Sequence, residues 1–318
     1  MARQSTNTDS SQQNLGFQGG GFDWDSYIKH RPQYSETLYR RIYEYHSRLS
    51  SNVFDTAHDV GAGVGTVSEK LAKQFKHVIV SEPNTEYMDI AKGRLSSNQE
   101  GKFTYLAERA ETSSVKSGTV DLIVISEAIQ WTDIPSSINE FGRQLKSGGT
   151  LCIIQYGRIY FPDNEEAEKV WTDLFMDVER TTDDWDDSKK EVYFRAARSI
   201  ATGLDNVAFP ARDWRPGVKR TFTNTGGDKR RVGFAIRWEE EEDRFGPDDK
   251  REFVEGDEEW IRTNCDLKWL QGVFASFVPG RKAEENLERW KEMERAIGGK
   301  NGRVNVEWPN VQIFVTRR

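Results

Sequence analysis

The segment DVGAGVGTVSEKL, residues 59–71, holds residue types that are typical of a ligand-binding turn. It follows a short apolar run, precedes a helical pattern and carries Gly61, Gly63 and Gly65. Glycines after a strand let a ligand approach the backbone closely, and dinucleotide sites use the spacing G-x-G-x-x-G. Here Thr66 stands where the third glycine of that pattern belongs. The spacing therefore argues against a dinucleotide.

Two acids near this turn narrow the choice of ligand. Asp59 precedes the glycines, where a carboxylate would repel a pyrophosphate but attract a positively charged amine. Glu82 ends the apolar run HVIVS, where a carboxylate accepts hydrogen bonds from both hydroxyls of a ribose. A ligand with an amino-acid end and a ribose satisfies both acids. S-adenosylmethionine is such a ligand.

Alternating strands and helices would bring these residues together. Apolar, β-branched runs such as HVIVS and TVDLIVISEAI alternate with helical patterns from residue 55 to 156, and Ser35 and Asn84 are expected helix N-caps. This order predicts an α/β fold with a doubly wound, Rossmann-like sheet of seven mostly parallel strands. Ligands of such sheets bind outside the carboxyl ends of the strands. We therefore expect the site at that edge.

The alternation stops near residue 157, where tryptophans and charge runs become frequent. The final run, RVNVEWPNVQIFVTRR, predicts a hairpin around Pro309 and Asn310 that ends the sheet with an antiparallel strand. The Ser/Gln/Asn/Gly-rich start predicts disorder. The expected domains are a tail (1–20), a ligand-binding domain (21–156 plus 301–318) and an inserted, substrate-binding cap over the strand ends (157–300).

Composition limits the partners. The 318 residues include 45 Lys and Arg against 52 Asp and Glu, so the net charge is -7. That balance argues against nucleic acid and anionic membranes, and no apolar run approaches the roughly 20 residues that span a bilayer. Cys152 and Cys265 lie in apolar contexts and predict buried free thiols and a cytoplasmic location. The four histidines show no zinc-like spacing, so we expect no metal.

The glycine segment, Glu82 and the order of elements together resemble the cofactor-binding motif of class I S-adenosylmethionine-dependent methyltransferases. FDWDSYIKHRPQYSETLYRRIYEYH resembles the opening of the trans-aconitate methyltransferase-like group, common in fungi. SEAIQWTD resembles that group's A-x-H-W-x-D signature, and WPNVQIFVTRR its C-terminal strand. The resemblance covers about residues 21–156 and 303–318, and reaches the insert only loosely. It implies S-adenosylmethionine as cofactor and O-methylation of a small molecule in secondary metabolism.

The resemblance also implies roles for single residues. Glu82 would bind the ribose, and Asn84 and Met88 would lie beside the adenine, although core packing explains Met88 equally well. Ser126 would lie at the methyl-transfer end. The residues implied in contacts with the methionine moiety are Asp59, Gly61, Gly63 and Gly65.

Two further segments depart from the pattern or extend it. Relatives place an acid for the adenine amine where this chain has Arg109, so the backbone of Ala110 could serve instead. Tyr27 and Arg31 match a segment that covers the cofactor. Tyr27 could attract the sulfonium through its ring face, and Arg31 could bind the cofactor carboxylate, or else both are ordinary surface residues.

The expected methyl-transfer end holds Gln130 and Trp131. Relatives often carry His in place of Gln130, and a glutamine takes no proton at neutral pH. We therefore expect alignment rather than base catalysis from Gln130, while Trp131 either lines the pocket or fills the core. A carboxylate acceptor needs no base, but a phenol or enol does. The base candidates are His30, Tyr160 and Glu127.

The insert is expected to select the substrate, since its aromatic content favours an apolar pocket. Its cations either anchor an anionic substrate or form a solvated strand face; they are Arg212, Arg215, Lys219 and Arg220. Three alternatives remain. They are an NAD(P)-dependent oxidoreductase on the same sheet, a non-methylating or regulatory protein on this fold, and a methyltransferase acting on nucleic acid or protein.

Overall fold

A computed structural model describes residues 24–49, 53–96, 101–235, 237, 242–277 and 286–318. The expected tail, residues 1–20, lies outside this part of the chain. The strands are β1 (Thr56–Val60), β2 (His77–Ser81), β3 (Phe103–Leu106), β4 (Val120–Ser126), β5 (Leu145–Tyr156), β6 (Lys219–Thr223), β7 (Lys250–Val254), β8 (Ile261–Cys265), β9 (Val304–Glu307) and β10 (Asn310–Thr316).

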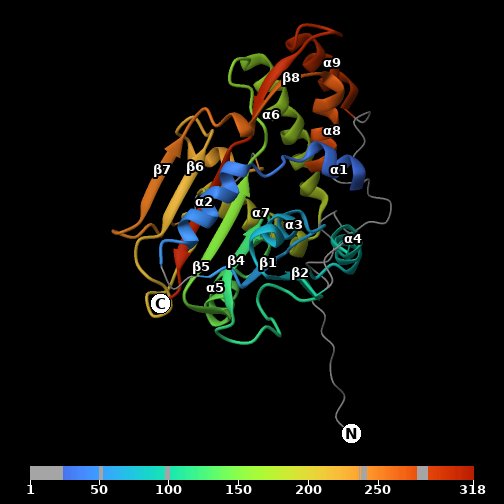
Figure 1. Cartoon of the computed structure of the whole chain (residues 1–318). Helices are drawn as coiled ribbons and strands as arrows, with labels where there is room; N and C mark the ends of the chain where they lie inside the picture. The colour runs from blue at the N-terminus through green and yellow to red at the C-terminus, as the bar shows by residue number, and fades with distance from the viewer. Residues whose placement is uncertain (1–23, 50–52, 97–100, 236, 238–241, 278–285) are drawn as a thin grey trace.

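Helices connect and cover these strands (Figure 1). The α-helices are α1 (Trp24–His30), α2 (Glu36–His46), α3 (Thr66–Gln74), α4 (Thr85–Leu95), α5 (Ile134–Gln144), α6 (Glu165–Arg180), α7 (Asp187–Ala201), α8 (Leu267–Phe277) and α9 (Leu287–Ala296). The 3₁₀ turns are η2 (Ile129–Trp131), η3 (Thr181–Asp184), η4 (Lys229–Val232) and η5 (Glu258–Trp260). The expected N-caps Ser35 and Asn84 are confirmed, because each side chain accepts a backbone N–H of its helix.

The large sheet has the order β3-β2-β1-β4-β5-β10-β6-β7. Neighbours from β3 to β5 pair in parallel, as do β6 and β7, whereas β10 runs antiparallel between β5 and β6. The predicted α/β fold with a mostly parallel sheet and an antiparallel C-terminal strand is confirmed. Within the described part of the chain the sheet has eight strands rather than seven, because β7 extends one edge.

Both faces of the sheet are buried, as in a doubly wound fold. Leu122 and Val124 of β4 pack in one core with apolar residues of α2, α3, α6 and α8. Ile123 and Ile125 of the same strand pack in a second core with α5 and α7. Successive side chains of a strand point to opposite faces, so a continuous apolar run fills both cores.

The predicted C-terminal hairpin is wrong. β9 pairs with β8 in a separate two-stranded sheet, and only β10 joins the large sheet. The two runs separate at Trp308, whose N–H donates to the carbonyl of Trp260, and at Pro309, whose carbonyl accepts from Gly157. Alternation is the same for every half-buried strand, so it does not reveal which distant strand is the partner.

The insert does more than cap the strand ends, because residues 157–300 also supply β6 and β7. Arg220 of β6 is fully buried rather than solvated, since Asp205 and Asp249 neutralise it. The helices α6, α8 and α9 gather at the top of the molecule in Figure 1, away from α5.

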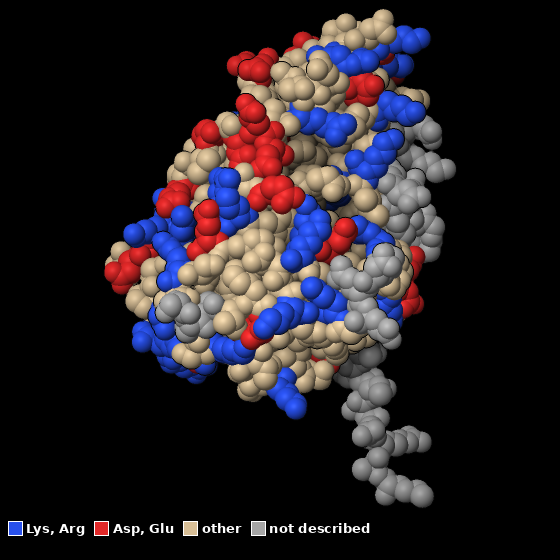
Figure 2. All heavy atoms as spheres, viewed as in Figure 1, with Lys and Arg blue, Asp and Glu red and all other residues tan. Residues whose placement is uncertain are grey.

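The surface mixes charges of both signs. Figure 2 shows Lys and Arg interspersed with Asp and Glu over the face in view. No helix in the described part of the chain combines the length and the apolar character needed to cross a membrane.

Candidate functional site

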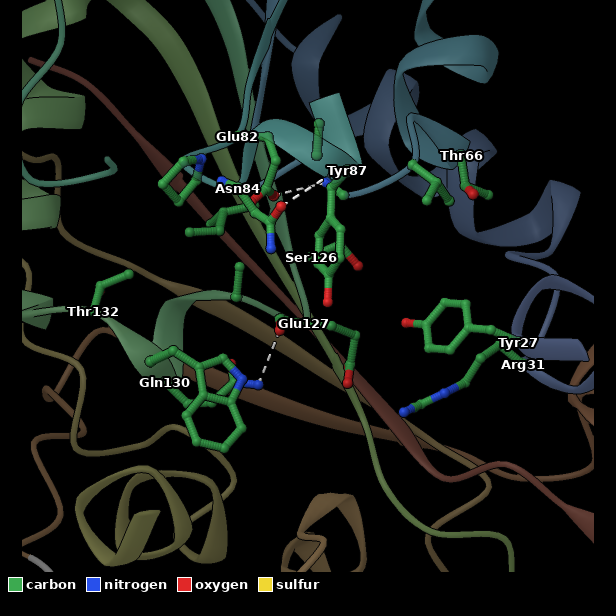
Figure 3. A pocket seen from close by; sticks show the side chains of 18 of the residues that line it. Tyr27, Arg31, Thr66, Glu82, Asn84, Tyr87, Ser126, Glu127, Gln130 and Thr132 are labelled. Carbon is green, nitrogen blue, oxygen red and sulfur yellow. Dashed lines mark hydrogen bonds between the residues drawn. The ribbon is translucent and has the colours of Figure 1, made fainter. Parts of the chain in front are cut away.

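A cavity of about 1100 Å³ lies at the carboxyl ends of the central strands (Figure 3). Residues that follow β1, β2 and β4 line it, among them Gly63, Glu82 and Glu127. Tyr27 and Arg31 reach it from the N-terminal segment, and helices of the insert close the opposite wall. The edge predicted from the order of strands and helices is therefore where the hollow lies.

The three glycines of the loop serve different purposes. All have left-handed φ values, of +64° at Gly61, +54° at Gly63 and +81° at Gly65. A Cβ on Gly61 would lie 2.6 Å from that of Ala128, and one on Gly65 2.9 Å from Leu95. A Cβ on Gly63 would meet no heavy atom within 4 Å, and Gly63 lines the cavity. Gly63 thus leaves an open cradle, whereas the other two allow close packing.

Glu82 is held at the end of β2 by backbone donors. Its carboxylate accepts the N–H of Gly63 at 3.0 Å and that of Asn84 at 2.9 Å. Burial raises the pKa of Glu82, and these two hydrogen bonds act in the opposite direction. A carboxylate has about four lone-pair sites, so Glu82 keeps acceptor capacity while its position is fixed (Figure 3).

Asp59 lies within β1, is almost fully buried and lines the cavity. Its carboxylate accepts a hydrogen bond from the hydroxyl of Ser68 in the first turns of α3. Burial raises the pKa of Asp59 to about 7, although the bonds from Ser68 oppose that rise. A cationic group in the cavity would stabilise the ionised form that burial disfavours.

Arg31 is clasped by aromatic rings. Its guanidinium lies 3.9 Å from the centre of the Phe277 ring and 5.0 Å from that of Tyr27. Nη1 donates to the Tyr156 hydroxyl and Nη2 to the carbonyl of Ser276, at 3.1 and 2.9 Å. Nε is buried without a hydrogen-bond partner. Arg31 therefore lines the cavity, and each of its Nη atoms bonds to the protein through one N–H.

The residues after β4 form the floor of the cavity. The Ser126 hydroxyl donates to the Tyr34 hydroxyl at 2.6 Å. The Gln130 amide donates to the carbonyl of Glu127 at 3.1 Å, while its Oε1 is buried without a partner. Gln130 thus has one acceptor oxygen left over.

The insert supplies an aromatic wall. Trp131 stacks on Phe234 of the insert, with ring centres 5.6 Å apart and planes inclined by 14°. Lys189 lies 4.0 Å from the centre of the Trp185 ring. The side chains of α6 and α7 on this wall include Phe175, Val178, Val192 and Tyr193. Trp131 therefore lines the pocket, and the wall suits a flat apolar ligand.

Some of the residues predicted from the sequence line the cavity and others do not. Met88 is buried but does not line the cavity, so core packing accounts for it. Arg109 does line it beside Ala110, while being exposed and 4.0 Å from Glu111. Of the base candidates, His30 packs against Gly272, and only Glu127 lines the cavity.

The remaining base candidate, Tyr160, is also occupied outside the cavity, where its hydroxyl donates to Glu307. The four cations of the insert do not line the cavity either. Arg212 pairs with Asp213, and Lys219 pairs with Glu252. The interpretation that they anchor an anionic substrate is therefore not supported.

Sequence reasoning missed four tyrosines that line the cavity, namely Tyr34, Tyr87, Tyr156 and Tyr193. Tyr87 follows the N-cap Asn84 in the first turn of α4, which is a local signal for a residue near the strand ends. Tyr156 ends a strand whose partner segments are distant, so no local signal marks it. Cys152 and Cys265 are buried and unpaired, and no group of three metal-ligating side chains occurs within the described ranges.

Comparison with known proteins identifies methyltransferases as relatives of this chain. Residues 58–153 match the methyltransferase domain family. The methyltransferase AacuQ of Aspergillus aculeatus is 31% identical over 95% of this chain and 94% of its own length. The methyltransferase pgmE of Aspergillus terreus is 30% identical over 92% of this chain and 93% of its own.

A solved structure supports the fold. A putative type II methyltransferase from Anaeromyxobacter dehalogenans superposes with a TM-score of 0.57 at 16% identity, covering 89% of this chain and 97% of that one. The cavity is consistent with this relationship, because the open space at Gly63 lies next to the carboxylate of Glu82 at the strand ends. The chain belongs to the class I S-adenosylmethionine-dependent methyltransferases.

Proposed function

We propose that the chain transfers a methyl group from S-adenosylmethionine to an oxygen of a small-molecule metabolite. The observation that carries this proposal is a single cavity that runs from the glycine loop to the aromatic wall of the insert. Its volume of about 1100 Å³ slightly exceeds the usual range for small-molecule sites, roughly 300–1000 Å³. It therefore has room for a cofactor and an acceptor together.

The residues present fit this cofactor. The open cradle at Gly63 would receive it, Glu82 would accept hydrogen bonds from its ribose, and Asp59 would face its amine. Tyr27 and Arg31 would cover it from the N-terminal segment. When bound, S-adenosylmethionine supplies a methyl group activated by a sulfonium.

The protein's own contribution is positioning. The wall formed by Trp131 and Phe234 would orient a flat acceptor, and the buried floor at Gln130 would keep water out. Holding two reactants in line removes much of the entropic barrier to a bimolecular transfer. Exclusion of water also protects the activated methyl from hydrolysis.

Calorimetric titration of the full chain tests the cofactor. We expect S-adenosylmethionine and S-adenosylhomocysteine to bind with micromolar affinity, and NAD⁺ not to bind. Incubation with isotopically labelled S-adenosylmethionine and a panel of hydroxylated and carboxylated aromatic compounds then tests the transfer. Mass spectrometry should find a labelled O-methyl product. NAD⁺ binding alone would favour the oxidoreductase, and cofactor binding without transfer to any acceptor class would favour the regulatory alternative.

A further inference from the structure

Glu127 occupies an unusual position at the end of β4. Its φ of +56° is left-handed, a conformation that a non-glycine residue adopts at a cost of about 1 kcal/mol or more. Its N–H donates to the carbonyl of Ile154 on β5, and its carboxylate accepts the N–H of Tyr156. The next residue, Ala128, packs against Gly61 of the glycine loop. Glu127 is thus fixed in the cavity beside the loop that would hold the cofactor.

Among the described residues, the carboxylate of Glu127 accepts hydrogen bonds from neutral donors only. Besides the N–H of Tyr156, it accepts the side-chain amide of Gln155 at 3.3 Å. Arg31 is the nearby cation, but its Nη atoms bond to the Tyr156 hydroxyl and to the carbonyl of Ser276. Within the described ranges no ion pair neutralises Glu127. The charged and titratable groups that face it are Arg31, Tyr34 and Tyr156.

This environment lets Glu127 exchange a proton near neutral pH. Burial raises its pKa to about 8, and the hydrogen bond from Tyr156 and the charge of Arg31 only partly oppose that rise. Glu82, by comparison, follows β2 and accepts the backbone N–H groups of Gly63 and Asn84. A general base works best when its pKa lies near the working pH and near that of its proton donor.

We propose that Glu127 is the general base of the transfer and that the acceptor is a phenolic or enolic hydroxyl on a flat, ring-containing molecule. This inference rests on the proposed function and names its substrate class. The acceptor's O–H bond breaks and its proton goes to the Glu127 carboxylate. The oxygen's electron pair forms the new bond to the methyl carbon, and the pair of the breaking carbon–sulfur bond stays on sulfur.

Two features of the cavity support this acceptor. A phenol has a pKa of about 10, close enough to Glu127 for proton transfer during methyl transfer, whereas a carboxylate would need no base. The stacked pair of Trp131 and Phe234, with Trp185 nearby, offers flat surfaces to a ring. The acceptor ring becomes more electron-rich as its hydroxyl loses the proton. The positive charge of Lys189, which lies over the Trp185 ring, is compatible with that change.

A matched pair of probes tests the proposal on the full chain. We expect methylation of 2-naphthol in preference to 2-naphthoic acid. The rate with 2-naphthol should rise about tenfold per pH unit below pH 8 and level off above it. Glu127→Gln should lower kcat at least 100-fold and abolish that pH dependence. The Kd for S-adenosylhomocysteine should stay within about twofold of the wild-type value.

Three further variants and one spectroscopic measurement keep the test decisive. Glu168→Gln is the matched control, since Glu168 also accepts a backbone N–H but lies outside the cavity. Glu127→Asp should keep the pH dependence with a lower kcat, and Asp59→Asn identifies the other titrating carboxyl. Infrared titration should show a protonated carboxyl with a midpoint near pH 8 that disappears in Glu127→Gln but not in Asp59→Asn or Glu168→Gln.

The inference and the proposed function fail in different ways. If wild-type protein does not bind S-adenosylhomocysteine, the proposed function falls. If it binds and methylates a probe while Glu127→Gln retains kcat and the pH profile, only the inference falls. Preference for 2-naphthoic acid, or a Glu127 carboxyl already ionised at pH 6, would likewise overturn the inference alone.

Discussion

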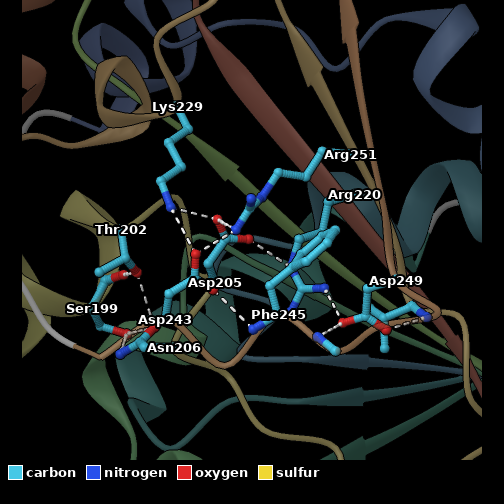
Figure 4. A network of polar contacts seen from close by, with 12 residues as sticks. Ser199, Thr202, Asp205, Asn206, Arg220, Lys229, Asp243, Phe245, Asp249 and Arg251 are labelled. Atoms are coloured by element: carbon cyan, nitrogen blue, oxygen red, sulfur yellow. Dashed lines mark hydrogen bonds and ion pairs between the residues drawn. The ribbon is translucent and has the colours of Figure 1, made fainter.

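Buried carboxylates occur in two regions of this molecule under opposite conditions. Beside β6 and β7, Asp205 of the segment after α7 is fully buried and contacts Arg220 at 2.9 Å, Lys229 at 2.7 Å and Arg251 at 2.7 Å (Figure 4). In the cavity, Glu127 accepts hydrogen bonds from the Tyr156 N–H and the Gln155 amide, which are neutral, and Asp59 accepts one from the hydroxyl of Ser68. The first region is compensated by charge, whereas the second is not.

This difference separates structure from function. A buried acid that contacts several cations holds together the segments that carry those charges. A buried acid without a cation has a raised pKa, so it can bind a proton or pair with a positively charged ligand. The cavity is therefore the region where charge changes during binding or reaction.

The largest expected effect is at the centre of the ion network. Asp205→Ala would leave Arg220 with Asp249 as its remaining partner and would remove the Asp205 contacts of Lys229 and Arg251. Breaking a buried ion pair by removing one partner typically costs about 3–5 kcal/mol. Urea denaturation should show a loss of this size. A loss below 1 kcal/mol would mean that the network does not hold β6 and β7 in place.

The next effect concerns the cavity. Glu82→Ala removes the proposed ribose acceptor and should weaken S-adenosylhomocysteine binding by about 1–3 kcal/mol, as measured by calorimetry. Asp89→Ala is the matched control, because Asp89 lies exposed on α4 and contacts Lys92. If the two variants bound S-adenosylhomocysteine equally well, Glu82 would not be a contact of the cofactor.

The pH dependence of stability sharpens the comparison. Burial raises the pKa of Asp59 to about 7 and that of Glu127 to about 8, so the folded state binds more protons than the unfolded state in this range. Stability should therefore fall between pH 6 and pH 8, by on the order of 2 kcal/mol. Urea titrations at both pH values measure it. Glu127→Gln should flatten the dependence, and an unchanged slope would contradict the raised pKa.

The smallest effect is expected at the rim of the network. Asp243 contacts Arg251 and Lys229 but is 44% exposed. Asp243→Asn should cost less than about 1 kcal/mol, and 1 M NaCl should reduce the difference from wild type. This variant is also the matched control for Asp205→Ala. If Asp243→Asn lost as much stability as Asp205→Ala, solvent exposure would not determine how much each ion pair of the network contributes.

The sequence was sufficient to predict that the glycine loop and two acids meet at one edge of the sheet. Asp59, Gly63 and Glu82 belong to the ends of two neighbouring strands, so local pattern and strand order together place them on one edge. The wall opposite was not predictable in the same way. Phe234 stacks on Trp131 across a long stretch of chain, and nothing in either local sequence indicates that contact.

The fold shows the same division. The alternation between residues 55 and 156 predicts the parallel strands, because each crossover is local and has one favoured hand. β9 and β10 share the same alternation, yet one pairs with β8 and the other with β5 and β6. Arg220 looks solvated in sequence and is buried in the fold, because its partners Asp205 and Asp249 come from other segments.

Because β10 follows the other strands of the sheet in the chain but lies inside the sheet, the sheet cannot be completed until β10 has been translated. β5 pairs with β10 on one side, so that side of β5 stays without its final neighbour until residues 310–316 are translated. At about 5–20 residues per second, translation of the insert takes roughly 7–30 s. Throughout that interval the nascent chain presents an open strand edge, which favours association with other chains. Chaperone demand should therefore be greatest while the insert is being made.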